Sequence, residues 1–167
     1  ISLTLHKVFD HLNELSQSDS AIPGLSTGLR DLDRKINGLN KSDLLLVAAR
    51  PAMGKTSFAL NIGLNVAKKY KSTVAIFSLE MSREQLAMRL LSGESFVDSQ
   101  KLLTGKLEDE EWGKLTMAAT SLSQTDIRVD DNPSITVAEM NAKLRRVDNL
   151  GLVIIDYLQL MTGSGYS

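Results

Sequence analysis

The chain has 167 residues, a length that suits one domain with a hydrophobic core of its own. Its 19 basic and 20 acidic residues leave a net charge of −1, which excludes a strong basic field for nucleic acid but not a local patch. Cysteine is absent, so disulfide bonds and thiolate metal sites are excluded, as is typical of a cytoplasmic protein. The sequence has no apolar run long enough to span a bilayer.

The first predicted element is an amphipathic helix over residues 1–16. Its apolar side chains recur at helical spacing on one face: Leu5, Val8, Phe9, Leu12 and Leu15. The polar stretch after it, with Ile22-Pro23-Gly24, predicts a flexible joint over residues 17–24, and residues 25–167 form the main domain. The spacing fits equally a helix packed on its own core and a helix docked on a neighbouring subunit. Because the sequence begins with Ile1, we expect a piece of a longer protein or a processed product.

A buried strand, a phosphate-binding loop and a helix are predicted in succession. The apolar run Leu44–Ala49 is typical of a strand covered on both faces. Gly54-Lys55-Thr56 then matches the end of the Walker A pattern, in which glycine admits a phosphate, lysine reaches the β- and γ-phosphates and the hydroxyl binds Mg²⁺. Ala49 replaces the first glycine of that pattern, a change that a negative φ allows. The apolar helix expected over Lys55–Lys69 strengthens the prediction of a nucleotide site.

Strands and helices alternate through the rest of the chain. Further strands are predicted over Thr73–Leu79, Ile127–Val129 and Leu152–Asp156. Such alternation implies right-handed crossovers and a mostly parallel sheet flanked by helices, so the predicted fold class is α/β. In sheets of this kind, ligands bind at the carboxyl ends of the strands. Residues that end these strands are therefore candidates for the site.

Sequence signals mark where the later helices begin. Capping boxes at Ser82 and Thr136 each predict a helix, the first extending to about Leu91. The acidic run Glu108–Glu111 begins another helix, where the helix dipole favours negative charge, and this interpretation is preferred over a metal site. Large apolar side chains of that helix are expected in or near a core: Trp112, Leu115, Met117 and Leu122.

Two carboxylates follow predicted strands and complete the candidate site. Asp156 ends an apolar strand, which is a Walker B pattern whose carboxylate holds Mg²⁺ directly or through water. Glu80 follows the strand that begins at Thr73, and a carboxylate there can accept the proton of the water that attacks the γ-phosphate. The alternative for Glu80 is a charge near the start of the next helix.

These motifs resemble those of the bacterial replicative DNA helicases of the DnaB type. Three segments look like the first three helicase motifs of that family: Ala48–Thr56, Phe77–Met81 and Asp156–Met161. Two more segments are also similar to it: Ile22–Asp33 and Gly105–Trp112. The family has alanine at the position of Ala49, so this departure does not weaken the resemblance. The resemblance covers nearly the whole chain and implies a RecA-like P-loop NTPase core preceded by a linker helix.

The resemblance also implies an activity and its partners. It implies an ATP- and Mg²⁺-dependent motor that translocates 5′ to 3′ on single-stranded DNA and unwinds duplex at the replication fork. Such motors are ring-shaped homohexamers, assembled through the linker helix and the nucleotide-bearing interfaces, with a primase and a helicase loader as partners and no membrane. The first helix would then dock on the adjacent subunit.

Residue roles follow from the same resemblance. Lys55 would bind the β- and γ-phosphates, Thr56 and Asp156 would hold Mg²⁺, and Glu80 would activate water. The loop and its neighbours would wrap the phosphates: Arg50, Pro51, Ala52, Met53, Gly54 and Ser57. Arg89 would reach the base or lie exposed, with the base favoured, and Gln159 would relay the nucleotide state.

The resemblance also suggests what a complete motor would add. The family continues beyond the Walker B strand with a sensor strand, DNA-contacting loops and an arginine finger, and it carries an N-terminal domain. We therefore expect the front part of a motor domain, cut after the Walker B strand. Two alternatives are a non-motor ATP-binding regulator or loader, and a RecA-like recombinase or clock-type ATPase. The segments Ala49–Pro51 and Asp156–Leu160 favour the helicase.

Overall fold

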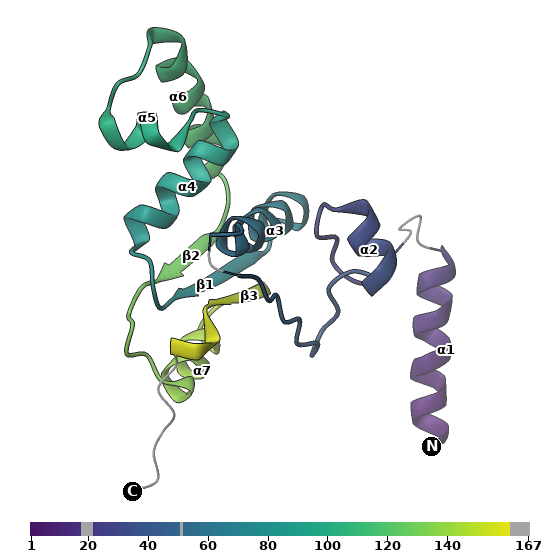
Figure 1. Ribbon diagram of the computed structural model, residues 1–167. Coiled ribbons are helices and arrows are strands. Elements are labelled where there is room, and N and C mark those ends of the chain that lie inside the picture. Colours follow the sequence, from purple (N-terminus) through teal and green to yellow (C-terminus); the bar gives the residue numbers. More distant parts are fainter. Residues whose placement is uncertain (18–21, 51, 161–167) are drawn as a thin grey trace, which may run out of the picture. The chain divides into compact units, whose positions relative to one another are not determined.

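The computed structural model describes residues 1–17, 22–50 and 52–160 (Figure 1). The chain divides into two compact units, Ile1–Leu46 and Val47–Ser167, and each is described by itself. The phosphate-binding loop and the sheet both belong to the second unit. Among the helices of the described residues, none has the length and apolar character that a membrane span requires.

The first unit holds helices α1 (Ser2–Gln17) and α2 (Arg30–Ile36). The helix predicted over residues 1–16 is confirmed, and Leu5, Val8, Phe9 and Leu12 on its apolar face are all exposed. The side chain of Leu15 lies outside the described part of the structure, as do residues 18–21 of the predicted joint. Helix α2 was not predicted, because its seven residues are too few to show helical periodicity.

A buried carboxylate organises the segment that surrounds α2. Asp33 accepts hydrogen bonds from the Ser26 hydroxyl (2.6 Å), the Thr27 hydroxyl (2.7 Å) and the Thr27 amide (2.8 Å). Leu25 and Leu39 exchange backbone hydrogen bonds close by, as an antiparallel bridge. A buried charge needs such partners, since an unpaired carboxylate is costly to remove from water.

The second unit is built on a parallel sheet of three strands in the order β2-β1-β3, which confirms the predicted α/β class. The strands are β1 (Thr73–Ser78), β2 (Ile127–Asp130) and β3 (Leu150–Asp156). All six residues of β1 are buried, because this strand is central and covered on both faces. The register places Ser78 beside Asp156, so the ends of β1 and β3 meet at one edge.

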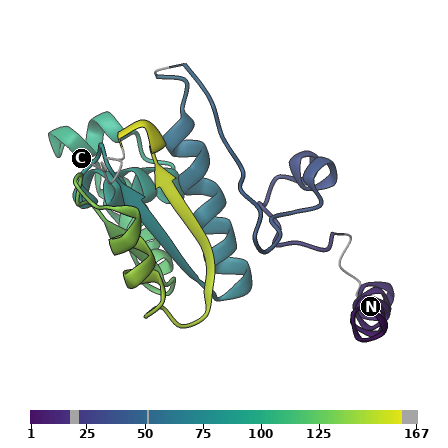
Figure 2. The same ribbon diagram turned by 90° about the horizontal axis from the view of Figure 1, so that it is seen from below.

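Helices cover the two faces of the sheet. Helix α3 (Lys55–Tyr70) contacts all three strands, and Gly63 allows its close approach: a Cβ there would lie 2.9 Å from Cδ1 of Ile154. Helix α7 (Val137–Leu144) packs on the opposite face, where Met140 meets Phe77 in a buried apolar cluster. Figure 2 shows the sheet between these two helices. The predicted capping box at Thr136 is present at the start of α7.

Three helices lie between β1 and β2 in sequence: α4 (Arg83–Ser95), α5 (Ser99–Thr104) and α6 (Asp109–Ser123). The predicted capping box at Ser82 is present, and α4 continues past the expected end near Leu91. Helix α5 was not predicted. An ion pair between Lys68 and Glu94 joins α3 to α4, and the Ser121 hydroxyl donates to Glu94 from α6 (3.0 Å).

The expected burial of the apolar side chains in α6 is only partly confirmed. Leu115 is buried and Leu122 is half-buried, but Trp112 and Met117 are 55% and 76% exposed. Helix α6 packs with one face on α4, and Met117 lies on another face. Placing Trp112 and Met117 in or near a core was therefore wrong.

The prediction of a strand over Leu44–Ala49 is also wrong. These residues have irregular backbone in the structure, and Leu44 and Leu46 are 83% and 70% exposed. A strand forms only where neighbouring strands supply hydrogen bonds and burial, so apolar composition alone does not decide it. In the sheet of the described residues, β3 is paired on one side only, by β1, and the run Leu44–Ala49 does not join it.

Candidate phosphate-binding site

The loop before α3 presents backbone amides rather than a capping side chain. Gly54 is the N-cap of α3, with φ of 85°, and has no side chain to accept from the first amides of the helix. Ala52 also has a positive φ, 63°, and the Met53 amide donates to the Arg50 carbonyl (3.3 Å). The amides at a helix N-terminus lack partners within the helix and attract anions. Ala49 is not among the described residues with positive φ. This is the condition under which alanine can replace the first glycine of the Walker A pattern.

Lys55, Thr56 and Asp156 converge at the start of this helix. The Thr56 hydroxyl donates to Oδ2 of Asp156 at 2.6 Å, and Lys55 Nζ lies 3.5 Å from Oδ1 of the same carboxylate. Asp156 is buried at the end of β3, whereas Lys55 and Thr56 are half-buried. The structure thus brings the Walker A lysine and hydroxyl to the Walker B carboxylate, as the motifs predicted.

The oxygen atoms of this cluster fit Mg²⁺. Magnesium is held in proteins by one or two oxygen ligands, together with waters and phosphate oxygens. Thr56 Oγ1 and Asp156 Oδ2, 2.6 Å apart, are a hydroxyl and a carboxylate that can supply such ligands. Within the described residues there is no group of three or more His, Cys, Asp or Glu side chains arranged to hold a metal ion alone. A cation held by Thr56 and Asp156 would take its other ligands from waters and phosphate oxygens.

Tyr157 also belongs to this cluster, although sequence reasoning did not single it out. Lys55 Nζ lies 4.0 Å from the centre of the Tyr157 ring, which is a cation–π distance. The ring and the Asp156 carboxylate together hold the ammonium group beside the loop. Its position directly after the Walker B aspartate was the available signal, but nothing in the sequence shows that its ring meets Lys55.

Glu80 lies at the same edge of the sheet. The Leu79 amide donates to the Asp156 carbonyl (2.8 Å), which extends the pairing of β1 and β3 by one residue. The Ser78 hydroxyl donates to the Met81 carbonyl (2.7 Å) and accepts from the Met81 amide (3.2 Å), so the turn that contains Glu80 is closed. Glu80 itself is exposed to solvent, next to the strand end that carries Asp156.

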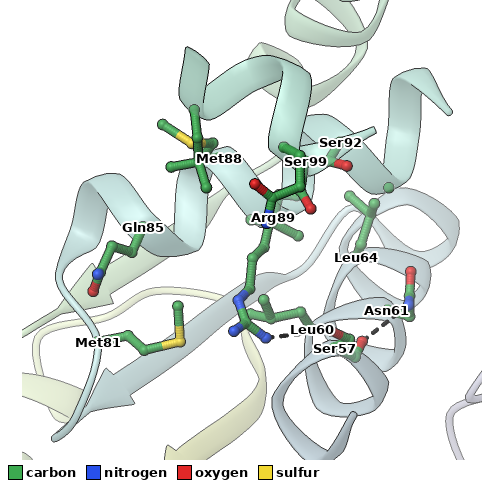
Figure 3. Close-up of a pocket in the computed structure, with 14 residues that line it drawn as sticks. Ser57, Leu60, Asn61, Leu64, Met81, Gln85, Met88, Arg89, Ser92 and Ser99 are labelled. Atoms are coloured by element: carbon green, nitrogen blue, oxygen red, sulfur yellow. Dashed lines mark hydrogen bonds between the residues drawn. The ribbon is translucent and has the colours of Figure 1, made fainter. Parts of the chain in front are cut away.

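Arg89 lies near the loop and beside a pocket. Its guanidinium Nη1 donates to the Ser57 hydroxyl (3.4 Å), one residue after Thr56. The pocket is about 560 Å³ and is lined from α3, α4 and α5, with Met81, Gln85 and Leu60 on its walls. Figure 3 shows Arg89 reaching across it from α4 toward Ser57. The side chain therefore points to the helix that begins at the phosphate loop.

Other predicted site residues are less involved in these contacts. Arg50, Ala52 and Met53 are exposed, and Met53 is 72% exposed. Pro51 lies outside the described residues. Gln159 is exposed in the short 3₁₀ helix η1 (Leu158–Leu160), just past the cluster.

Comparison with known proteins shows the family of this chain. The sequence matches the family model described as the DnaB-like helicase C-terminal domain over residues 24–167. The chain belongs to this family. It is 52% identical over 166 residues to the replicative DNA helicase DnaB of Geobacillus stearothermophilus. It is 51% identical to the replicative DNA helicase DnaC of Bacillus subtilis (strain 168). Each match covers 98% of this chain and 37% of the relative, so the chain spans little more than a third of their length.

Solved structures of DnaB-like proteins share the fold. One structure, described by its title as an ATPase domain, superposes with a TM-score of 0.89 at 31% identity, over 100% of this chain and 60% of that chain. A DnaB-like replicative helicase, whose structure title adds its interactions with primase, gives a TM-score of 0.86 at 30% identity. That match covers 98% of this chain and 41% of the other. The fold is therefore that of the RecA-like ATPase domains of DnaB-like helicases.

Proposed function

We propose that the chain is part of an ATP-dependent DNA helicase motor. In this proposal, hydrolysis of Mg·ATP drives translocation on single-stranded DNA and unwinding at the replication fork. The observation that carries the proposal is the convergence of Lys55, Thr56 and Asp156 at the N-terminus of α3. The names of the relatives support a helicase over a non-motor regulator or a recombinase.

The residues of the cluster divide the work of binding and hydrolysis. Lys55 and the amides after Gly54 bind the phosphates, because an ammonium group and a helix N-terminus both attract anions. Thr56 and Asp156 hold Mg²⁺, which neutralises phosphate charge when it is bound. Glu80 accepts a proton from the attacking water. Arg89, whose guanidinium contacts Ser57, reaches the base of the nucleotide. The exposed residues Arg50, Ala52 and Met53 surround the phosphates together with Pro51.

The expected partners follow from the family. We propose a homohexamer in which α1 docks on the adjacent subunit, because its apolar face is exposed within its own unit. Single-stranded DNA, a primase and a helicase loader are the other proposed partners, and a structure title names primase for one DnaB-like relative. Cytoplasmic DNA replication is the proposed setting.

Nucleotide binding by the chain itself tests the proposal. We expect the parent to bind a fluorescent ADP analogue in the presence of Mg²⁺ and Lys55→Ala to lose most of that affinity, because the change removes the cation that faces the phosphates. Lys106→Ala, which removes an exposed lysine from the loop between α5 and α6, is the matched control. Equal affinity in the parent and Lys55→Ala would sink the assignment of the phosphate site.

A further inference from the structure

The N-terminus of α4 is held by a residue that follows β2, although α4 itself follows β1. The Asp131 carboxylate, directly after β2, accepts a hydrogen bond from the Arg83 backbone amide at 3.0 Å. Its other oxygen accepts from the Arg83 guanidinium at 3.1 Å. Arg83 is the first residue of α4, so its amide is one of those that have no partner within the helix. Asp131 therefore fastens the start of α4 to the end of β2.

Two candidate site residues depend on where α4 begins. Glu80 precedes Arg83 by three residues, and Arg89 is carried by α4 and donates to Ser57 beside the phosphate loop. The turn between β1 and α4 is closed at its other end by the Ser78 hydroxyl. Asp131 and Ser78 thus fix both ends of the short segment that contains Glu80.

The contact is stronger than an ordinary exposed ion pair. An exposed salt bridge contributes little, but a carboxylate that accepts from a helix-terminal amide makes a charge-assisted hydrogen bond and also meets the helix dipole. The backbone amide of Arg83, more than its guanidinium, lowers the pKa of the Asp131 carboxyl below its ordinary value. Asp131 is therefore ionised at neutral pH, in the form that anchors the helix.

We propose that Asp131 is a positioning residue for ATP hydrolysis, which acts by holding the start of α4 and, through it, Glu80 and Arg89. The inference rests on the proposed function, since both residues are assigned roles there. Asp131 touches neither the phosphate loop nor Asp156 by any contact of the described residues. Its effect therefore falls on the chemical step, which needs Glu80 in place, rather than on phosphate binding by Lys55.

The adjacent carboxylate provides a matched control. Asp130 is also ion-paired, but with Lys143 on α7, which packs on the sheet away from α4. Asp130 also accepts from the Asn132 amide (3.1 Å), and Asp130→Asn keeps a side-chain oxygen for that bond. This substitution removes the same charge one residue away and leaves the Arg83 contact in place. A second comparison is Arg83→Gln, which keeps the backbone amide that Asp131 accepts from and removes the guanidinium.

Steady-state hydrolysis by the whole protein is the first test. We expect Asp131→Ala to lower kcat about tenfold and to change KM less than that, because a displaced Glu80 slows the chemical step whereas Lys55 still binds the phosphates. Asp131→Asn, whose side-chain carbonyl can still accept from the Arg83 amide, recovers part of the loss. Asp130→Asn and Arg83→Gln stay close to the parent. Parent-like kcat in Asp131→Ala, while Glu80→Gln is inactive, would overturn the inference and leave the proposed function standing.

Amide hydrogen exchange gives a second readout in the chain itself. We expect Asp131→Ala, but not Asp130→Asn, to speed exchange of the Arg83 amide about tenfold or more, because that amide loses its acceptor only in Asp131→Ala. Unchanged exchange would show that the anchor does not hold, and would also overturn the inference. If Lys55→Ala binds nucleotide as the parent does, the proposed function itself fails.

Discussion

At the scale of single residues, one buried carboxylate joins the two halves of the site. Asp156 receives the Thr56 hydroxyl and lies within 3.5 Å of the Lys55 ammonium group, which the Tyr157 ring also contacts. A buried carboxylate is stable when such partners offset its lost hydration. The same partners bring together a hydroxyl, a cation and a carboxylate, which are the groups that the proposed Mg·ATP site requires.

Glu80 provides the sharpest test of the chemistry. We expect Glu80→Gln to abolish ATP turnover in the whole protein and to keep nucleotide binding, because the amide retains the size of the side chain but cannot accept the proton. Turnover is followed by phosphate release and binding by a fluorescent nucleotide. Glu84→Gln is a matched control, since Glu84 is an exposed carboxylate on the first turn of α4. Hydrolysis at the parent rate would show that Glu80 is only a charge near the start of α4.

The candidate site residues that could be predicted from the sequence belong to local motifs. Lys55 and Thr56 follow a glycine in a fixed pattern, and Asp156 ends an apolar strand, so each could be predicted without knowing its neighbours. Tyr157 and Asp131 could not, because their importance comes from side chains that are distant in sequence. The spacing of a sequence shows which helix face a residue occupies, but not which element meets that face.

At the scale of elements, helices with local start signals were predicted well. The capping boxes at Ser82 and Thr136 are both formed, since they depend only on residues within one turn. The short helices α2 and α5 were missed because their periodicity is too brief to detect. The strand prediction for Leu44–Ala49 was wrong for a different reason. The composition of this run is typical of a strand, but a strand also needs a neighbouring strand to pair with.

Gly63 in α3 and Gly113 in α6, compared with each other, test how closely α3 packs on the sheet. We expect Gly113→Ala, on the exposed side of α6, to stabilise the fold by about 0.5–1 kcal/mol, because alanine favours the helix and nothing obstructs its methyl group. Gly63→Ala gains no such stability, since its methyl group would lie 2.9 Å from Ile154 and 3.3 Å from Val74. Urea unfolding measures both. Equal stabilisation would show that α3 and β3 yield easily.

At the scale of the whole molecule, the chain exposes apolar surface and unpaired backbone on several separate elements. The face of α1 presents Leu5 and Phe9 at 50% and 67% exposure, and the irregular run that precedes the phosphate loop in sequence presents Leu44 and Leu46. In the described sheet, β3 also has an unpaired side, which offers backbone groups to another strand. Surfaces of this kind mark sites of association.

We therefore expect the 167-residue chain to self-associate in a concentration-dependent way. Light scattering coupled to size-exclusion chromatography measures the mass at several loadings. Phe9→Ser should lower the associated fraction, because it removes an exposed ring from the apolar face of α1, whereas Glu14→Ser on the opposite face is the control. A clean monomer at every loading would contradict this prediction and weaken the proposed role of α1 in assembly.

The contact between Thr56 and Asp156 also has a consequence for how the protein folds. The two residues are 100 positions apart, and every strand of the described sheet lies between them or ends at Asp156. Contacts that close such long loops are slow to form, because the chain entropy is lost before the contact is gained. During synthesis, α3 and β1 emerge from the ribosome long before the carboxylate that completes the site. Formation of the hydrogen bond between Thr56 and Asp156 would therefore report that β3 has joined the sheet.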